Sequence, residues 1–148
     1  MAELFTIRDA RESDMPLIDS YAHAEGMDRI PGPARVRVAV NGDDAVVGFC
    51  RLQDDANGIA YVNPIVTYEP WRGYGVGRAL MEDAQNLAGE LRLIARGTSV
   101  GFYRALGFSD MDWSETDQSA ASEDCDNCPY REACGPVPMK LPVEKRTD

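Results

Sequence analysis

The chain has 148 residues, a formal net charge of -10, 44% hydrophobic residues and 27% charged residues. This length fits one domain that can bury a core without disulfides or a structural metal. The composition excludes a chain that is disordered throughout. No apolar run approaches the roughly 20 residues of a membrane span. The first residues, Met-Ala-Glu-Leu-Phe, lack the pattern of a secretion signal, so we expect a cytoplasmic protein with no membrane partner.

The charge balance bears on possible partners. Because phosphate binding needs clustered positive charge, the acidic composition argues against a nucleic-acid partner. It favours cationic ligands, such as polyamines, aminoglycosides or lysine-bearing peptides. Of the 15 basic residues only Lys140 and Lys145 are lysines, a bias typical of a GC-rich or salt-adapted genome. Anion binding explains arginine at one or two positions, but not at all of them.

The first half of the chain predicts antiparallel strands and one helix. Residues 3–8 alternate as a strand does, and residues 35–40 and 45–52 predict a hairpin around the turn at 41–43. Between them, a helix is expected from Ser13 as its N-cap to Gly26. Its predicted apolar face consists of Met15, Leu17, Ile18, Tyr21 and Ala22.

The second half alternates strands and helices. A strand is expected over residues 59–67, with Pro64 interrupting its ladder. The next elements are a helix over 76–88 closed by Gly89, a buried strand over 91–95 and a helix over 98–106. The last strand, over 137–143, contains Pro138 and Pro142 and is therefore expected at a sheet edge. The sequence thus predicts a mixed α/β fold.

A glycine-rich stretch, Arg-Gly-Tyr-Gly-Val-Gly at residues 72–77, lies between a predicted strand and a predicted helix. Glycines there let the backbone approach an anion, and the N–H groups of the helix N-terminus complete the pocket. A dinucleotide fingerprint needs a third glycine where Arg78 or Leu80 stands, and a Walker loop needs Gly-Lys-Ser/Thr, which this stretch lacks. The pattern indicates a pyrophosphate loop; the alternative is a turn without a ligand.

The sequence resembles the GCN5-related N-acetyltransferase (GNAT) superfamily. Residues 64–81 resemble its acetyl-CoA-binding motif, and residues 102–108, Phe-Tyr-Arg-Ala-Leu-Gly-Phe, resemble its second motif. The opening Ile7-Arg8-Asp9-Ala10 is also typical of the family, so the resemblance covers about residues 4–110. It implies a largely antiparallel central sheet flanked by helices, with splayed strands that form a V-shaped CoA cleft. Residues 1–148 are accordingly expected to form a single acetyltransferase domain.

The activity implied by this resemblance is direct transfer of an acetyl group from acetyl-CoA to a primary amine of a small molecule or peptide. Backbone groups near Ile65 and Val66 would pair with pantetheine, and the amides of residues 73–78 would hold the pyrophosphate, with Arg72 orienting the loop. The residues expected to bind the cofactor are Ile65, Val66, Arg72, Gly73, Tyr74, Gly75, Val76, Gly77, Arg78 and Ser99.

Tyr103 matches the family's tyrosine near the departing sulfur, where a phenol can donate a proton to the CoA thiolate. The alternative is an aromatic side chain packed beside Phe102 and Phe108. Many members of the family carry Asn seven residues earlier, where this chain has Arg96. An arginine there either reaches a CoA phosphate or faces solvent.

The general base is less evident, because residues 59–66 contain no acidic side chain. Glu69 lies nearby in the loop and can act directly or through a water molecule. His23, on the first helix, has a suitable intrinsic pKa. The alternative for each of these two residues is an ordinary surface or structural role.

Three cysteines, Cys125, Cys128 and Cys134, form a compact knuckle within the loop inserted at residues 110–136, before the last strand. This spacing suits zinc or an iron–sulfur cluster, and the alternative is thiols that are unliganded or redox-active. The expected sources of a fourth ligand are Cys50, His23, Asp124 and Asp126. Cys50 itself, beside Val47 and Phe49, is expected to be a small core residue.

Two functions therefore compete. The first is an N-acetyltransferase. The second is a catalytically weak CoA-binding or metal- or redox-sensing module on the same fold, which the missing strand carboxylate and the cysteine knuckle suggest. Acetyl transfer to an amine would decide for the first, and CoA binding without turnover for the second. Since dimers are common in the family, a homodimer is also expected.

Overall fold

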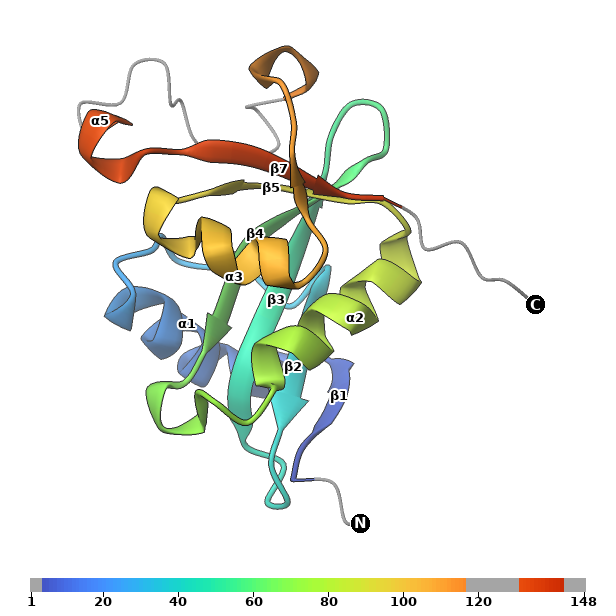
Figure 1. Cartoon of the computed structure of the whole chain (residues 1–148). Coiled ribbons are helices and arrows are strands. Elements are labelled where there is room, and N and C mark those ends of the chain that lie inside the picture. Colours follow the sequence, from blue (N-terminus) through green and yellow to red (C-terminus); the bar gives the residue numbers. More distant parts are fainter. Residues whose placement is uncertain (1–3, 117–130, 143–148) are drawn as a thin grey trace. The chain divides into compact units, whose positions relative to one another are not determined.

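The structure is a computed structural model that describes residues 4–116 and 131–142. Its strands follow the hydrogen-bonded order β1-β2-β3-β4-β5-β7-β6 (Figure 1). The chain divides into two compact units, of which the first comprises Met1–Leu52 and Pro64–Ala84. The second comprises Gln53–Asn63 and Gln85–Asp148. The expected mixed sheet, mostly antiparallel and flanked by helices, is confirmed.

The first unit is built on an antiparallel meander. Its strands are β1 (Thr6–Asp9), β2 (Val36–Val40) and β3 (Val46–Asp54), which continues into the second unit. The register places Thr6 opposite Val40, and Val40 opposite Val46. In the turn between β2 and β3, Oδ1 of Asn41 accepts the backbone N–H groups of Asp43 (2.9 Å) and Ala45 (3.1 Å). This side-chain turn closes the hairpin that the sequence predicts.

Helix α1 (Met15–Ala24) follows a short 3-10 turn, η1 (Glu12–Asp14), and ends at Gly26 with φ +70°. The expected N-cap at Ser13 is wrong: Ser13 lies inside η1, and the N-cap of α1 is Asp14, whose side chain makes no capping hydrogen bond to the helix. Instead, Oδ2 of Asp14 accepts the backbone N–H of Arg11, the residue before η1, at 2.7 Å. Leu17 was expected on the buried face but is 40% exposed.

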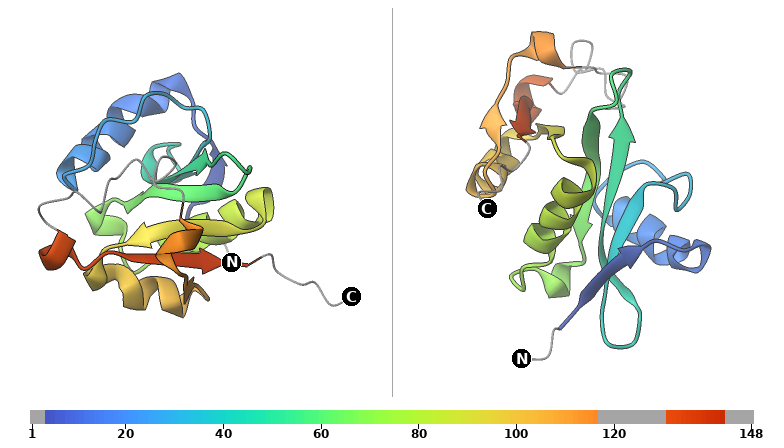
Figure 2. Two further views of the ribbon diagram at one scale, coloured as in Figure 1. Left: turned by 90° about the horizontal axis from the view of Figure 1, so that it is seen from above. Right: turned by 90° about the vertical axis from the view of Figure 1, so that its right-hand side faces the viewer.

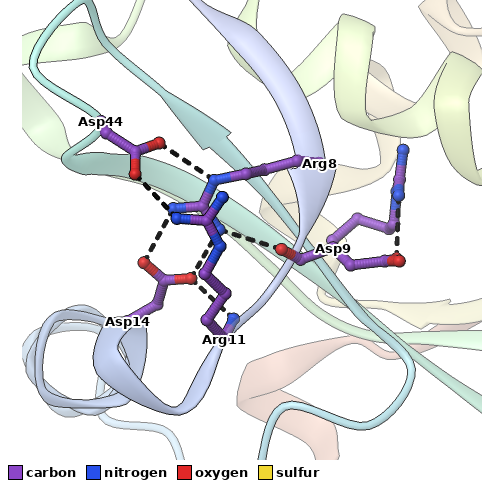
Figure 3. Close-up of polar contacts among 6 residues, drawn as sticks. Arg8, Asp9, Arg11, Asp14 and Asp44 are labelled. Atoms are coloured by element: carbon purple, nitrogen blue, oxygen red, sulfur yellow. Dashed lines mark hydrogen bonds and ion pairs between the residues drawn. The ribbon is translucent and has the colours of Figure 1, made fainter.

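An ion-pair network joins β1, η1 and the β2–β3 turn (Figure 3). Nη1 and Nη2 of Arg8 donate to the two carboxylate oxygens of Asp14 at 2.7 and 3.0 Å, and Nε donates to Asp44 at 3.1 Å. The hydrogen bond from Arg8 lowers the pKa of Asp14, which is itself buried. Arg11 adds a bond to Asp44 at 3.0 Å. The start of α1 is therefore fixed by charge as well as by apolar packing.

Helices lie on both faces of this meander (Figure 2). On one face, α1 contributes Met15, Ile18 and Ala22 to an apolar cluster that also contains residues of β2, β3 and β4. On the other lies α2 (Val76–Ala88), whose residues up to Ala84 belong to this unit. A Cβ on Gly48 would lie 2.8 Å from Cγ1 of Val76. Glycine at this position of β3 thus permits the close approach of α2.

The second unit carries the other strands. They are β4 (Ala60–Thr67), which begins in this unit and ends in the first, β5 (Leu91–Ala95), β6 (Ser109–Asp110) and β7 (Val137–Leu141). β4 and β5 are parallel, whereas β7 is antiparallel to both β5 and β6. The expectation that β7 lies at an edge is wrong, because the two-residue strand β6 covers its other side.

Pro138 can occupy this interior strand because the N–H that proline lacks would not have paired with β5. The carbonyl of Pro138 accepts the N–H of Met111 at 2.9 Å, on the side that faces β6. A strand residue directs its N–H and C=O to the same side. The donor that Pro138 lacks would therefore have faced β6, and the β5–β7 ladder loses no bond.

The helices of the second unit are short. They are η3 (Gly97–Ser99), α3 (Val100–Ala105), η4 (Trp113–Glu115) and α5 (Arg131–Cys134). Gly107 ends α3 with φ +101°. A Cβ on Gly97 would lie 3.2 Å from the carbonyl oxygens of Cys134 and Gly135, so the turn before α3 packs directly on the backbone after α5. None of the described helices is long and apolar enough to cross a membrane.

Candidate functional site

The glycine-rich stretch forms a strand–turn–helix in the first unit. After β4 the chain makes a 3-10 turn, η2 (Glu69–Trp71), and reaches α2 through residues 72–75. Gly73 and Gly75 have φ values of +88° and +83°, in the left-handed region that disfavours side chains. No atom lies within 4 Å of the Cβ that either glycine would carry. Glycine is therefore needed here for the backbone conformation, and the loop has open space in front of it.

The N-terminus of α2 offers unpaired donors to that space. The N–H of Ala79 donates to the carbonyl of Gly75 at 3.0 Å. The amides of Val76, Gly77 and Arg78 precede this bond and have no acceptor within the helix. Together with the helix dipole they make a site for an anion. The side chain of Val76 is buried at 1% exposure, so only its backbone is available to a ligand, whereas Arg78 is exposed.

The loop is anchored on its N-terminal side. A guanidinium nitrogen of Arg72 donates to Oε1 of Glu25, at the C-terminal end of α1, and the N–H of Arg72 donates to the carbonyl of Glu69 at 3.0 Å. The ring of Trp71 packs on Phe5 and Tyr74, with centroid distances of 6.5 and 5.5 Å. Arg72 therefore orients the loop through Glu25, a residue that the sequence did not single out because the contact spans 47 positions.

The end of β4 is held against α1 by two tyrosines. The rings of Tyr21 and Tyr68 stack with centroids 4.8 Å apart, and the Tyr21 hydroxyl donates to the carbonyl of Val46 at 2.8 Å. Burial, with the neighbouring Tyr68, raises the pKa of Tyr21. The phenol of Tyr21 therefore stays protonated near neutral pH and acts as a fixed donor.

Ile65 and Val66 lie outside the part of β4 that pairs with β5. That register consists of Ala60 with Leu91 and Tyr61 with Arg92, although β4 continues to Thr67. Val66 is 5% exposed and its side chain belongs to the α1 cluster, while Ile65 is half-buried. The Val66 side chain is therefore unavailable to a ligand, which leaves only its backbone groups.

Tyr103 and Ser99 belong to the second unit. The half-buried ring of Tyr103 packs edge-on against Phe102 and Phe108, with centroid distances of 5.2 and 5.7 Å. Ser99 closes η3, where its N–H donates to the carbonyl of Arg96 at 2.8 Å. The Arg96 side chain is exposed. The structure thus gives Tyr103 its expected aromatic neighbours.

The candidate bases differ little from ordinary surface residues. Glu69 is exposed in η2, at the start of the glycine-rich loop, and His23 is exposed on α1. Only Glu69 lies on the same strand–loop–helix segment as the expected cofactor residues.

The cysteines are only partly described. Cys125 and Cys128 lie outside the described residues, and Cys134 is half-buried at the end of α5. Within residues 4–116 and 131–142, no group of three or more His, Cys, Asp or Glu side chains could hold a metal ion. Cys50 is 1% exposed, and burial raises the pKa of its thiol to about 12. It is therefore a protonated core residue, as expected.

Comparisons with known proteins agree with this geometry. The acetyltransferase (GNAT) domain family matches residues 33–110. A peptidyl-lysine N-acetyltransferase of Escherichia coli is 39% identical over 83 residues, which cover 54% of this chain and 53% of that protein. An uncharacterized N-acetyltransferase of Chlorobaculum tepidum is 27% identical over 97 residues, covering 64% and 62%. The chain thus spans between half and two thirds of the length of these curated relatives.

Among solved structures, a Mycobacterium tuberculosis protein, Rv2747, crystallised with CoA, superposes with a TM-score of 0.75 at 18% identity. The superposition covers 94% of this chain and 99% of that one, and it shows a shared fold. Because the family match takes in more than half of the chain, including β4, the glycine-rich loop and α2, the chain belongs to the acetyltransferase (GNAT) domain family.

Proposed function

We propose that the protein is an acetyl-CoA-dependent N-acetyltransferase that acts on a primary amine of a small molecule or peptide. The observation that carries the proposal is the loop before α2. There, two left-handed glycines lead into amides that have no acceptor in the helix. Such a site suits the pyrophosphate of CoA. The names of the curated relatives, one of them a peptidyl-lysine N-acetyltransferase, support an amine acceptor.

In this proposal the first unit binds acetyl-CoA. The amides of residues 73–78 hold the pyrophosphate, and the Arg72–Glu25 pair keeps the loop in place. Backbone groups of Ile65 and Val66 pair with the pantetheine arm as an added strand would. The register with β5, which pairs only Ala60 and Tyr61, leaves Ile65 outside the β4–β5 ladder, and this supports the assignment. Ser99, in the turn before α3, is a further proposed contact.

The reaction is a direct transfer. The amine nitrogen attacks the thioester carbonyl carbon, a C–N bond forms, and the C–S bond breaks. Glu69 takes the proton that the amine loses, directly or through a water molecule, and the Tyr103 hydroxyl protonates the departing sulfur. The products are the acetylated amine and CoA thiol. Tyr103 is then reprotonated from solvent.

A thiol-release assay with acetyl-CoA and a panel of primary amines tests the proposal. We expect turnover by the wild type and a lower affinity for acetyl-CoA in Gly75→Ala, because alanine is disfavoured at φ +83° and would reshape the loop. Gly101→Ala is the matched control, since its Cβ meets nothing within 4 Å and its φ is not left-handed. Folded wild type without turnover on any amine would instead favour the catalytically weak CoA-binding module.

Substitution of Tyr103 separates its two roles. Tyr103→Phe keeps the ring among its aromatic neighbours and removes the hydroxyl, so kcat should fall by roughly 10²-fold or more if the phenol is the acid. The melting temperature and the affinity for acetyl-CoA should change little. An unchanged kcat would leave Tyr103 as a packing residue.

Three further expectations remain predictions. They are the zinc or iron–sulfur site at Cys125, Cys128 and Cys134, the cytoplasmic location and the homodimer. Metal analysis of protein purified without oxygen, set beside a Cys125→Ser/Cys128→Ser variant, tests the first. Metal at equal stoichiometry in both proteins would contradict it.

A further inference from the structure

The half-buried arginines differ in whether described residues of the protein supply an acceptor for the guanidinium. Within the part of the chain whose side chains the structure describes, four arginines are half-buried: Arg8, Arg37, Arg51 and Arg92. Taking a guanidinium away from water is costly unless an opposite charge or hydrogen-bond acceptors replace the water. The partners of these four residues therefore show how the chain offsets that cost.

Three of the four arginines contact carboxylates. Arg8 binds Asp14, as described above. Arg37 donates to both carboxylate oxygens of Asp83 at 2.9 Å and to Asp9 at 2.8 Å.

Arg92, in the second unit, follows the same rule. It donates to Glu90 at 2.8 Å and to the backbone carbonyl of Glu115 at 2.7 Å. In each of these three cases the protein itself supplies the acceptors.

Arg51 is the exception. Among residues 4–116 and 131–142, no carboxylate or other acceptor contacts its guanidinium. Burial alone lowers the pKa of Arg51, with no opposing contribution from an acidic neighbour. The group stays charged, because an arginine titrates far above neutral pH. Arg51 is therefore a partly desolvated positive charge for which these described residues provide no acceptor.

The position of Arg51 is well defined by its neighbours. It lies on β3 directly opposite Val36 of β2, and Phe49 is two residues earlier on the same face. Val36 and Phe49 are 2% and 0% exposed, and both belong to the apolar cluster under α1. The backbone is fixed as well, since the N–H of Leu52 donates to the carbonyl of Arg35 at 2.9 Å. Arg51 therefore stands at the border of a packed core, on the α1 side of the sheet.

We propose that Arg51 binds a carboxylate of the acceptor, so that the substrate is an amine that also carries a carboxylate, such as an amino acid. This inference rests on the proposed acetyltransferase function. A guanidinium matches a carboxylate with two parallel hydrogen bonds, which gives orientation as well as affinity. The ligand would supply the acceptors that the protein supplies to Arg8, Arg37 and Arg92.

The inference also refines the expectation from net charge. A formal charge of -10 favours cationic acceptors over anionic ones. An amino acid combines a cationic amine with one carboxylate, and a single local arginine suffices to select it. Polyamines lack the group that Arg51 would bind.

Turnover on matched acceptors is the first test. Each α-amino acid of a panel is compared with its carboxamide, using wild type, Arg51→Gln, Arg51→Lys and the control Arg29→Gln. Arg29 is an arginine of the same unit whose side chain is 86% exposed. We expect the wild type to prefer the carboxylate, and Arg51→Gln to lose that preference through a roughly 10- to 100-fold higher KM. Arg51→Lys should recover part of the loss, and Arg29→Gln should behave as wild type.

A binding experiment makes the result independent of catalysis. In a ¹H–¹⁵N spectrum of the arginine Nε–Hε groups, the Arg51 signal is the one that disappears in Arg51→Lys. Titration with N-acetylglycine should shift this signal, whereas N-acetylglycinamide should not. Both compounds lack an amine, so the result does not depend on turnover.

The outcomes separate the two proposals. Equal wild-type turnover of acids and amides, or an Arg51 signal that N-acetylglycine leaves in place, would overturn the role of Arg51 while acetyl transfer stands. A shift of the Arg51 signal with CoA, joined to a higher KM for acetyl-CoA in Arg51→Gln, would also overturn it, since the anion would then belong to the cofactor. A carboxylate-specific shift without turnover would support the anion site and contradict the acetyltransferase.

Discussion

Arg37 and Arg51 stand on adjacent rungs of the β2–β3 ladder, where Arg37 is opposite Cys50 and Val36 is opposite Arg51. Both are half-buried, yet their side chains emerge on opposite faces of the sheet. On the α2 side, Asp83 and Asp9 neutralise Arg37. On the α1 side, no described residue does the same for Arg51. Burial alone therefore does not distinguish a structural arginine from one that is available to a ligand. The presence of carboxylate partners does.

Removal of the paired arginine should have the largest effect. Arg37→Met leaves Asp83 partly buried without its guanidinium, and we expect a loss of about 2–4 kcal/mol in the free energy of unfolding. Urea denaturation followed by circular dichroism measures it. The double variant Arg37→Met/Asp83→Met should recover most of the loss, because it leaves no uncompensated charge at that contact. A loss below about 0.5 kcal/mol in the single variant would show that pairing at Arg37 matters little.

The ion pair between Arg8 and Asp14 should make the free energy of unfolding depend on pH. Asp14→Asn should cost about 1–3 kcal/mol at neutral pH, since it weakens bonds to a charged donor. The pKa of Asp14 is lowered in the folded state, so its contribution is complete above the unfolded value near 4. That contribution is lost as the pH falls through the folded value. The gap between wild type and Asp14→Asn in urea denaturation should therefore shrink below about pH 4.

A control exists on the same arginine. Asp44 contacts Arg8 but its side chain is 54% exposed, so Asp44→Asn should change the unfolding free energy by less than about 1 kcal/mol. If Asp44→Asn destabilised the protein as much as Asp14→Asn, the buried pair would not be the one that fixes the start of α1.

Local patterns predicted the elements well where neighbouring residues decide them. Residues 76–88 and 91–95 fold as the sequence predicts, because an amphipathic period and a following Gly89 with φ +80° set their limits. The hairpin over β2 and β3 is likewise encoded in its alternation and in Asn41. The turn between β4 and α2 could be predicted for the same reason, since its conformation depends on its own glycines, whereas the anion that it would bind stays a prediction.

Contacts outside the local pattern account for the errors. Ser13 is not the N-cap of α1 because Glu12–Asp14 form the turn η1, in which the Asp14 carboxylate binds the Arg8 guanidinium and the N–H of Arg11. The strand β7 is interior because a two-residue strand, too short to be recognised in the sequence, pairs with it. The sequence alone does not single out Arg51, because its lack of a partner among residues 4–116 and 131–142 becomes visible only when β2 and β3 are in register. No local pattern contains that information.

Replacement of Arg51, which has no acceptor among the described residues, should have the smallest effect on stability. In Arg51→Met the charge is replaced by an apolar chain beside Val36 and Phe49, so the free energy of unfolding should stay within about 0.5 kcal/mol of wild type or rise. Urea denaturation beside Arg37→Met measures the contrast. A loss as large as that of Arg37→Met would mean that Arg51 stabilises the fold through a partner, which would contradict its role as a binding residue.

Native mass spectrometry of the wild type with acetyl-CoA tests directly whether the loop before α2 binds this molecule. Gly75→Ala and Gly101→Ala serve as the loop variant and its control. We expect one acetyl-CoA per chain to add to wild type and to Gly101→Ala, and markedly less to add to Gly75→Ala. A wild-type protein that stays folded and adds no acetyl-CoA would contradict the proposed binding site, because the loop before α2 would then be a turn without a ligand.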